Sequence, residues 1–210
     1  MTLGPALAGG IRSLGLEIDT VTQEKLLAYV SLLEKWNRTY NLTAIREPER
    51  MVTHHLLDSL AVLPHLAGST LRIADIGSGG GLPGIPLALA QPTWQVALIE
   101  SSRKKSSFLR QASFELGLTG VEVVPLRVES YVPSIAFDVA ISRAYADLGA
   151  FIGAARRVAP SGRWLAMKGA YPQGELAMLP AAARMIAVPR LQVPGLQAER
   201  HLVIMEAAPG

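Results

Sequence analysis

Two acidic residues and a glycine-rich turn carry the clearest chemical signal in this sequence. Asp75 lies near the end of an apolar run that begins at Leu71, and five of the eight residues from 77 to 84 are glycine. Glycine allows positive φ angles and lets the main chain approach a ligand closely. The second acid, Glu100, ends the next apolar run and is placed to accept hydrogen bonds from ribose hydroxyls. This pattern predicts a pocket for a nucleoside cofactor.

Two nucleoside cofactors match the turn, and its charge favours one of them. Residues 79–84 fit G-x-G-x-x-G, a pattern of dinucleotide-binding proteins. From Asp75 the sequence also reads D-x-G-x-G-x-G, the arrangement associated with S-adenosylmethionine, whose ammonium group an acid can hold. A diphosphate would be repelled by the carboxylate, and Pro83 and Pro86 remove amide donors that it prefers. We expect S-adenosylmethionine, bound by Asp75, Glu100 and a turn that includes Gly79; a dinucleotide, or a turn without a ligand, remains an alternative.

Composition narrows the class of protein. The chain has 210 residues, half of them apolar, and no cysteine, which excludes disulfides, thiolate metal sites and cysteine nucleophiles. It has no basic leader and no apolar run of about 18 residues, so we expect a cytoplasmic protein without a membrane partner. The net charge of +3 permits a nucleic-acid partner without requiring one.

Hydrophobic spacing predicts the elements that must position these residues. Apolar positions at helical spacing predict a helix over residues 22–38 with Thr22 as its cap, a second over 48–63, and a short earlier one that includes Leu14 and Leu16. Short apolar runs predict strands at 71–76, 95–99, 121–124, 137–141, 163–167 and 202–205. This alternation indicates an α/β fold, a mostly parallel sheet with helices on both faces. We expect a helical extension over residues 1–68 and a Rossmann-like domain over 69–210.

In such a sheet the ligand lies across the carboxyl ends of the strands. The residues that follow the predicted strand ends should therefore line one rim. They are Gly77, Glu100, Val128, Glu129, Ser142, Arg143 and Lys168.

Several separated blocks in the right order carry a family resemblance over nearly the whole chain. They are Lys35-Trp36-Asn37 with Tyr40-Asn41-Leu42-Thr43, His55-x-x-Asp58-Ser59, the loop from Gly77 to Pro86, Phe108-Leu109-Arg110, Ile141-Ser142-Arg143-Ala144, and Lys168-Gly169 with Glu199-Arg200-His201-Leu202. With these motifs the chain resembles the bacterial 16S ribosomal RNA guanine-N7-methyltransferases, also called glucose-inhibited division protein B. The resemblance implies a class I S-adenosylmethionine-dependent methyltransferase with an N-terminal helical extension. It also implies methylation of N7 on the guanosine conventionally numbered 527.

The same resemblance implies further cofactor contacts. They fall on Gly77 and Leu82 in the loop, on Val128 and Glu129 beside the adenine, and on Arg143.

Methyl transfer to a ring nitrogen makes limited demands on the protein. Guanine N7 carries no proton to remove, so no general base is required. Alignment of the base with the methyl group and the sulfur can supply about 7–11 kcal/mol of the barrier. A bidentate arginine on O6 and N7 would cover the nucleophile, so we expect Arg143 or Lys168, as catalytic residues, to contact O6 or phosphate only. Methylation of pyrimidine C5 needs a cysteine, and the block that methylates exocyclic amines is absent after residue 141. A ring nitrogen is the favoured acceptor.

Several polar residues are candidates for contact with RNA. Arg103 and Lys104, together with Lys105 and Arg110, could bind phosphates or form a solvated helix face. Tyr40 and Asn41 follow the long helix as a predicted loop. Arg200 and His201 either close the substrate side or make structural hydrogen bonds. His55 and Asp58 have helical spacing, but no third metal ligand is evident, so we expect a helix-internal hydrogen bond or packing against the sheet, and no metal site.

The expected partner is 16S rRNA or the small ribosomal subunit, bound by a monomer. Three alternatives stay open: a dinucleotide-dependent oxidoreductase, a ribosome-associated RNA-binding protein with a vestigial pocket, and a methyltransferase for another acceptor.

Overall fold

The computed structural model describes residues 3–143 and 145–209. Ala144, part of one of the quoted blocks, lies outside them. The chain begins with a helical region whose elements are α1 (Leu3–Ser13), α2 (Thr20–Tyr40), α3 (Pro48–Met51), a π-helical turn η1 (Val52–Leu57), α4 (Asp58–Leu60) and a 3-10 turn η2 (Leu63–His65).

The rest of the chain alternates between strands and helices. The strands are β1 (Arg72–Ile76), β2 (Gln95–Ile99), β3 (Val121–Val124), β4 (Val139–Arg143), β5 (Arg163–Lys168), β6 (Ala183–Ala187) and β7 (His201–Ala207). The helices are α5 (Gly84–Ala90), α6 (Arg103–Glu115), a 3-10 turn η3 (Val128–Ser130), α7 (Leu148–Val158) and α8 (Gln173–Ala177). The strands form a 7-stranded sheet in the order β3-β2-β1-β4-β5-β7-β6, with β7 antiparallel to both of its neighbours and the other pairs parallel.

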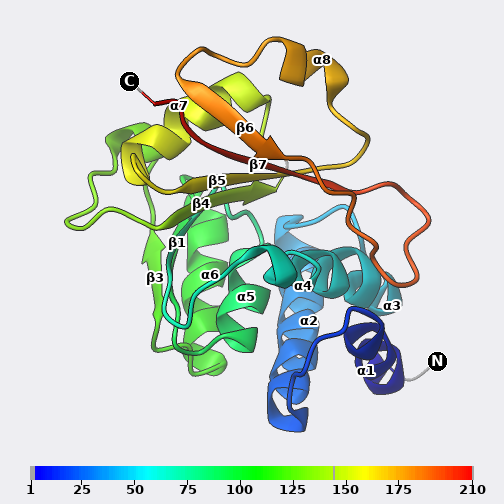
Figure 1. Ribbon diagram of the computed structural model, residues 1–210. Helices are drawn as coiled ribbons and strands as arrows, with labels where there is room; N and C mark the ends of the chain where they lie inside the picture. Colours follow the sequence, from blue (N-terminus) through cyan, green and yellow to red (C-terminus); the bar gives the residue numbers. More distant parts are fainter. Residues whose placement is uncertain (1–2, 144, 210) are drawn as a thin grey trace.

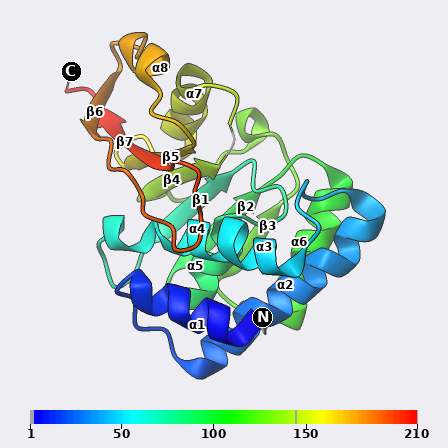
Figure 2. The same ribbon diagram turned by 90° about the vertical axis from the view of Figure 1, so that its right-hand side faces the viewer.

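Side chains alternate between two cores, one on each face of the sheet. Ile73 of β1 faces a core that also holds the buried residues of α1, α2, α5 and α6, whereas Ala74 and Ile76 face a core built with α7. Figures 1 and 2 show α5, α6 and the N-terminal helices on one side of the sheet and α7 on the other. The predicted mostly parallel sheet with helices on both faces is confirmed.

The predicted strands are found, with shifts at some of their ends. The strands at 95–99 and 121–124 have the predicted bounds, but the fourth begins at Val139 rather than at residue 137 and extends to Arg143. The strand β6 was not predicted. It lies at the edge of the sheet, and none of its residues is buried, although Met185 to Val188 are all apolar.

The predicted helices needed more correction. The cap of α2 is Asp19, whose Oδ1 accepts a 2.8 Å hydrogen bond from the Thr22 amide, so Thr22 lies inside the helix. Tyr40 ends α2 instead of beginning a loop, and Asn41 is the C-cap at φ 51°. The first helix ends at Ser13, before Leu14 and Leu16. The predicted helix over 48–63 is found as continuous helical backbone from Pro48 to Leu60, with a π-helical turn, Val52–Leu57, in its middle.

The helical extension supports the glycine-rich loop directly. Tyr29 of α2 is fully buried, and its hydroxyl donates a 2.6 Å hydrogen bond to the carbonyl of Gly80. Leu33, one helical turn further on, lies so close to Gly80 that a Cβ there would be 3.2 Å from Leu33 Cδ1. Residues before and after position 68 share one core. The division at 68 and 69 stays a prediction.

A neutral histidine is packed where the extension meets the end of β4. Nε2 of His55 lies 2.8 Å from Thr43 Oγ1, and Nδ1 lies 3.3 Å from NH1 of Arg143. Burial, together with the nearby Arg143 charge, lowers the pKa of His55 from 6.5 to about 4.

We predict that Gly84→Ala destabilises the protein. The Gly84 amide donates a 2.9 Å hydrogen bond to Asp75 Oδ2, and an added Cβ would overlap Leu98 and lie 2.7 Å from that oxygen. Overpacking of this kind costs about 1–3 kcal/mol of unfolding free energy, which urea denaturation measures. The matched control is Gly153→Ala in α7, where a Cβ meets no atom within 4 Å and the helix should gain about 0.5–1 kcal/mol. Equal effects of the two substitutions would contradict the prediction.

We also predict a pH-dependent contribution from His55. The unfolded chain protonates this residue below about pH 6.5, whereas the folded chain does so only near pH 4. The unfolded state therefore binds more protons between these values, and stability is lost as the pH falls from 6.5 to 4. Urea denaturation at several pH values should show a shallower fall for His55→Gln than for the unsubstituted protein. Parallel pH profiles would contradict the assignment.

Candidate functional site

A cavity of about 130 Å³ opens at the carboxyl ends of β1 and β2. It brings together four residues that the sequence places at the rim, Gly77, Glu100, Val128 and Glu129. Its other lining residues are Ile76, Ile99, Ser101, Leu126, Arg127 and Tyr145. This mixture of polar and apolar lining residues suits a nucleoside, whose sugar is polar and whose base has apolar faces.

The glycine loop meets this cavity at Gly77, while Gly79 is not among the lining residues. Gly77 has φ 71° and Gly79 has φ 59°, conformations that residues with a Cβ rarely adopt. The Gly77 amide donates to the carbonyl of Ile99 at 2.9 Å, which ties the loop to the end of the neighbouring strand. The exposed Gly77 therefore presents bare main chain at the cavity.

Glu100 joins the loop to the start of α6. Its Oε2 accepts a 2.9 Å hydrogen bond from the Gly79 amide, and its Oε1 accepts one of 2.8 Å from the Ser102 amide. Each carboxylate oxygen has two lone pairs and has accepted one of these bonds, so both can still accept a ribose hydroxyl. The side chain lies where the sequence predicted a ribose contact, and the contact itself stays a prediction.

Asp75 lies beneath the loop rather than in the cavity. The residue is completely buried, and its Oδ2 accepts the Gly84 amide at the start of α5. Burial raises its pKa to about 7, an effect that the Gly84 hydrogen bond and the charge of Arg143 partly offset. Its Oδ1 is buried without a hydrogen-bond partner among the described residues. The carboxyl group thus anchors the loop, and the expected contact with the cofactor ammonium stays a prediction.

Leu82 also points away from the cavity. Its side chain belongs to the core, and its amide donates to the carbonyl of Ser78 at 3.0 Å. A contact between Leu82 and the cofactor likewise stays a prediction.

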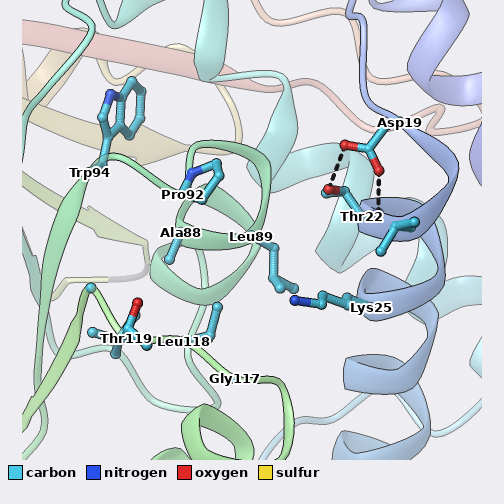
Figure 3. A pocket seen from close by; sticks show the side chains of 13 residues that line it. Asp19, Thr22, Lys25, Ala88, Leu89, Pro92, Trp94, Gly117, Leu118 and Thr119 are labelled. Atoms are coloured by element: carbon cyan, nitrogen blue, oxygen red, sulfur yellow. Dashed lines mark hydrogen bonds between the residues drawn. The ribbon is translucent and has the colours of Figure 1, made fainter.

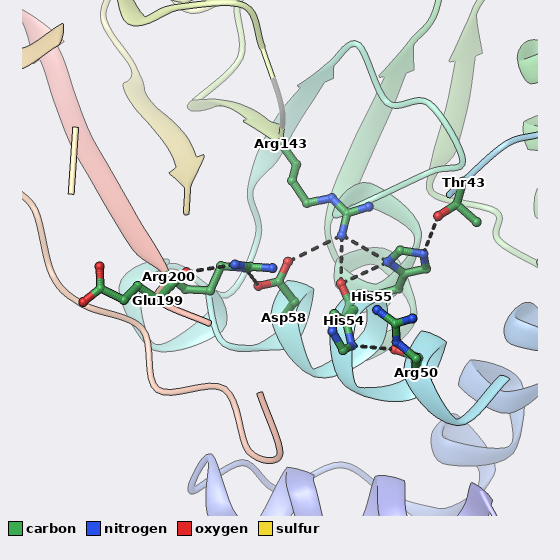
Figure 4. A network of polar contacts seen from close by, with 8 residues as sticks. All are labelled: Thr43, Arg50, His54, His55, Asp58, Arg143, Glu199 and Arg200. Carbon is green, nitrogen blue, oxygen red and sulfur yellow. Dashed lines mark hydrogen bonds and ion pairs between the residues drawn. The ribbon is translucent and has the colours of Figure 1, made fainter. Parts of the chain in front are cut away.

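Arg143, at the end of β4, extends toward the N-terminal helices (Figure 4). Its NH1 donates to the carbonyl of His54 at 3.0 Å and lies 3.4 Å from Asp58 Oδ2. The other oxygen of Asp58, Oδ1, accepts a 2.9 Å hydrogen bond from Nε of Arg200. The structure therefore joins Arg143 and Arg200, two predicted site residues, through a third residue.

Asp58 was assigned no such role from the sequence. A hydrogen bond within its own helix, or packing against the sheet, was expected, but its side-chain partners lie 85 and 142 positions away along the chain. No local pattern signals contacts of that separation. No group of three potential metal ligands occurs among the described residues.

Lys168 and His201 lie opposite one another on the antiparallel pair β5 and β7. Nζ of Lys168 is 2.8 Å and 3.0 Å from the two carboxylate oxygens of Glu175, so this ammonium group is already paired. His201 makes a 2.9 Å contact from Nδ1 to the carbonyl of Gly169 and packs its ring edge-on against Tyr171. Both predicted residues therefore have structural partners in the protein.

The remaining candidates are exposed. Arg103 and Lys104 begin α6, two and three residues after Ser101 of the cavity wall, and no ion pair with either is found in residues 3–143 and 145–209. Tyr40 stacks on Trp36 with the ring centres 5.2 Å apart. The carbonyl of Leu42 lies 4.0 Å from where a Cβ of Gly80 would be, so the residue after Asn41 adjoins the glycine loop.

A second cavity, of about 280 Å³, lies near the amino ends of the strands. Its side chains come from α2 on one side and from α5 and the residues before β2 and β3 on the other (Figure 3). Because it adjoins the amino ends of the strands, it is remote from the glycine loop. Within the part of the chain that the structure describes, no helix is long and apolar enough to cross a membrane.

Solved structures share this fold at low sequence identity. A SAM-dependent methyltransferase from Aquifex aeolicus has a TM-score of 0.60 and 18% identity, covering 84% of this chain and 97% of that one. TrmN from Thermus thermophilus has a TM-score of 0.56 and 17% identity, covering 75% and 53%. A variant of MtNAS in complex with S-adenosylmethionine has a TM-score of 0.59 and 18% identity, covering 90% and 77%. These likenesses confirm the predicted fold class.

Sequence comparisons show the family. The model of the GidB family, described as rRNA small subunit methyltransferase G, matches residues 22–203. A protein from Aromatoleum aromaticum named ribosomal RNA small subunit methyltransferase G is 56% identical over 205 residues, covering 95% of this chain and 97% of its own length. One of the same name from Chromobacterium violaceum is 53% identical over 207 residues, covering 98% and 99%. The chain therefore belongs to the rRNA small subunit methyltransferase G family.

Proposed function

We propose that this protein transfers the methyl group of S-adenosylmethionine to N7 of one guanosine in 16S ribosomal RNA. The observation that carries the proposal is the cavity at the carboxyl ends of β1 and β2, where Gly77, Glu100 and Val128 meet, in a chain of a small-subunit rRNA methyltransferase family. The likeness of the fold to a structure that holds S-adenosylmethionine supports this cofactor. The substrate is 16S RNA or the small subunit, and the enzyme acts as a cytoplasmic monomer.

The residues present fit the proposed cofactor. The glycine loop leaves room for main-chain approach, Glu100 keeps lone pairs for the ribose, and Val128 with Leu126 offers an apolar surface for the base. When bound, S-adenosylmethionine supplies an electrophilic methyl group for in-line displacement. Since N7 has no proton to lose, the chain needs no general base, and its residues have only to align the base and hold the RNA.

Arg143 is better placed than Lys168 to contact the RNA. The contacts of Arg143 within the described chain use NH1, which leaves Nε and NH2 as donors, and about a quarter of its side chain is exposed (24%). Lys168 forms an ion pair with Glu175. We therefore assign the contact with O6 or phosphate to Arg143 and a supporting role to Lys168.

The first prediction concerns the reaction itself. Labelled methyl from S-adenosylmethionine, supplied with 16S RNA or small subunits from cells that lack this gene, should be recovered as 7-methylguanosine at one position. Nucleoside analysis after digestion measures this, and NAD(P)H should not bind. Binding of adenosylhomocysteine without incorporation into either substrate would refute an rRNA acceptor.

The second prediction separates the two basic residues. Arg143→Gln should lower kcat/KM for RNA by about 10- to 150-fold, since a hydrogen bond to a charged group contributes about 1.5–3 kcal/mol. Lys168→Gln should lower it by less than about threefold, because that charge is already paired in the protein. Steady-state kinetics on folded variants measures both. Loss of the same size in the two variants, or none in Arg143→Gln, would contradict the assignment.

A further inference from the structure

Asp58 is a buried acid that two arginines from different strand ends share. It is 1% exposed, comes from α4 in the helical extension, and lies 3.4 Å from NH1 of Arg143 and 2.9 Å from Nε of Arg200. Arg143 ends β4, and Arg200 immediately precedes β7. Since β7 runs antiparallel to β5, the amino end of β7 lies beside the carboxyl ends of the parallel strands. The three residues therefore meet near those carboxyl ends, where the candidate cofactor cavity also lies.

The charges of this cluster do not balance. One carboxylate faces two guanidinium groups, and His55, packed against Arg143, is held neutral by its low pKa. One positive charge is left over, on side chains that remain about a quarter exposed (24% for Arg143 and 23% for Arg200). A single negative charge from outside the protein would neutralise it.

Both arginines keep donors for such a ligand. In the described chain the recorded contacts of Arg143 use NH1, and those of Arg200 use Nε and NH1, the latter to the carbonyl of Glu199 at 2.8 Å. Nε and NH2 of Arg143 and NH2 of Arg200 remain. Figure 4 shows the two side chains reaching Asp58 from opposite sides, with Arg143 fixed from its other side by His55 and the carbonyl of His54. Planar guanidinium groups bind phosphate oxygens through paired N–H donors.

Stability alone gives a weak reason for this arrangement. Taking a carboxylate out of water is costly, and replacing a buried ion pair by apolar residues is often neutral or stabilising. The cluster does impose a defined direction on two otherwise flexible side chains, and alignment is what the proposed reaction requires.

We propose that Asp58 is a positioning residue for methyl transfer, which fixes Arg143 and Arg200 as a joint site for one phosphate of the RNA strand beside the target base. The proposal rests on the proposed function, since it names a subsite for the same RNA. In this arrangement the N-terminal extension is part of the substrate site. It contributes the carboxylate of Asp58 and not one of the arginines.

The test uses the sign of the charge change. Asp58→Asn keeps the shape of the side chain and removes a negative charge, so charge attraction alone would strengthen RNA binding. Loss of positioning predicts the opposite, a fall in kcat/KM for RNA of about tenfold or more, with the dissociation constant of adenosylhomocysteine unchanged. The matched control is Glu34→Gln, which removes a carboxylate of the same extension that is paired with Arg38 at 2.7 Å on the exposed side of α2. This control should keep the kinetics of the unsubstituted enzyme.

A double variant shows whether Asp58 acts through the arginines. Asp58→Asn combined with Arg200→Gln should lose less than the product of the two single losses, because both substitutions disable the same subsite. A folded Asp58→Asn protein with unchanged or higher kcat/KM would overturn the proposal. Losses that multiply would also overturn it. Circular dichroism and an unfolding midpoint above the assay temperature establish that each variant is folded.

If Asp58→Asn does not fold, Arg200→Gln carries the test alone, since Asp58 keeps Arg143 as a partner. Loss of one phosphate contact should reduce the slope of log kcat/KM against log salt by about 0.7, the value for single-stranded nucleic acid. Arg200→Lys should restore part of the slope. An unchanged slope in Arg200→Gln would overturn the proposal. If the unsubstituted enzyme methylates no RNA, the proposed function itself fails, and the subsite fails with it before any variant is made.

Discussion

Main-chain groups of the loop between β1 and α5 are bound by three side chains from three separate elements. Asp75 of β1 accepts the amide of Gly84, Glu100 after β2 accepts the amide of Gly79, and Tyr29 of the extension donates to the carbonyl of Gly80. A loop bare enough for close approach has few side chains of its own, and of these Ser78 donates to the carbonyl of Asp75 and Leu82 packs in the core. The three hydrogen bonds from neighbouring elements add to these internal contacts in fixing the shape of the loop beside the cavity.

The basic residues near the carboxyl ends of the parallel strands differ in how far their charges are neutralised by carboxylates of the protein. Lys168 is neutralised by Glu175, whereas Arg143 and Arg200 share one carboxylate. Arg103 and Lys104 lie exposed at the start of α6. Salt screens exposed charges far more than partly buried ones, so the charges of Arg103 and Lys104 are more sensitive to ionic strength than those of the arginine pair. A modest net charge of +3 is thus compatible with a locally basic site.

Much of the fold could be predicted because its signals are local. Strands buried on both faces appear in the sequence as apolar runs, and turns that need positive φ are rich in glycine. The strand position of Ile73 and the turn position of Gly77 could therefore be predicted. The edge strand β6 was missed although Met185 to Ala187 are apolar, and none of its residues is buried. The family and the methyltransferase fold were likewise predicted from the motifs and are confirmed by the comparisons.

The polar part of the site was less predictable, for a physical reason. Asp75 and Glu100 were identified as site residues, but their bonds to loop amides depend on how the chain turns and not on residue type. The helical spacing of Asp58 from His55 predicts a local contact, whereas the observed partners of Asp58 come from strand ends far along the chain. Tyr29 lies within the helix predicted over residues 22–38, and no local pattern marks its hydroxyl as the group that reaches Gly80.

The contact between Asp58 and Arg200 spans 142 positions and links an early helix to the residue that precedes β7. Strand β7 inserts between β5 and β6, so β5 is left with an open edge until β7 has formed. Chains emerge from the ribosome with their N-terminal part first. The two arginines can therefore come together on Asp58 only after the segment that leads into β7 has been made and β7 has joined the sheet.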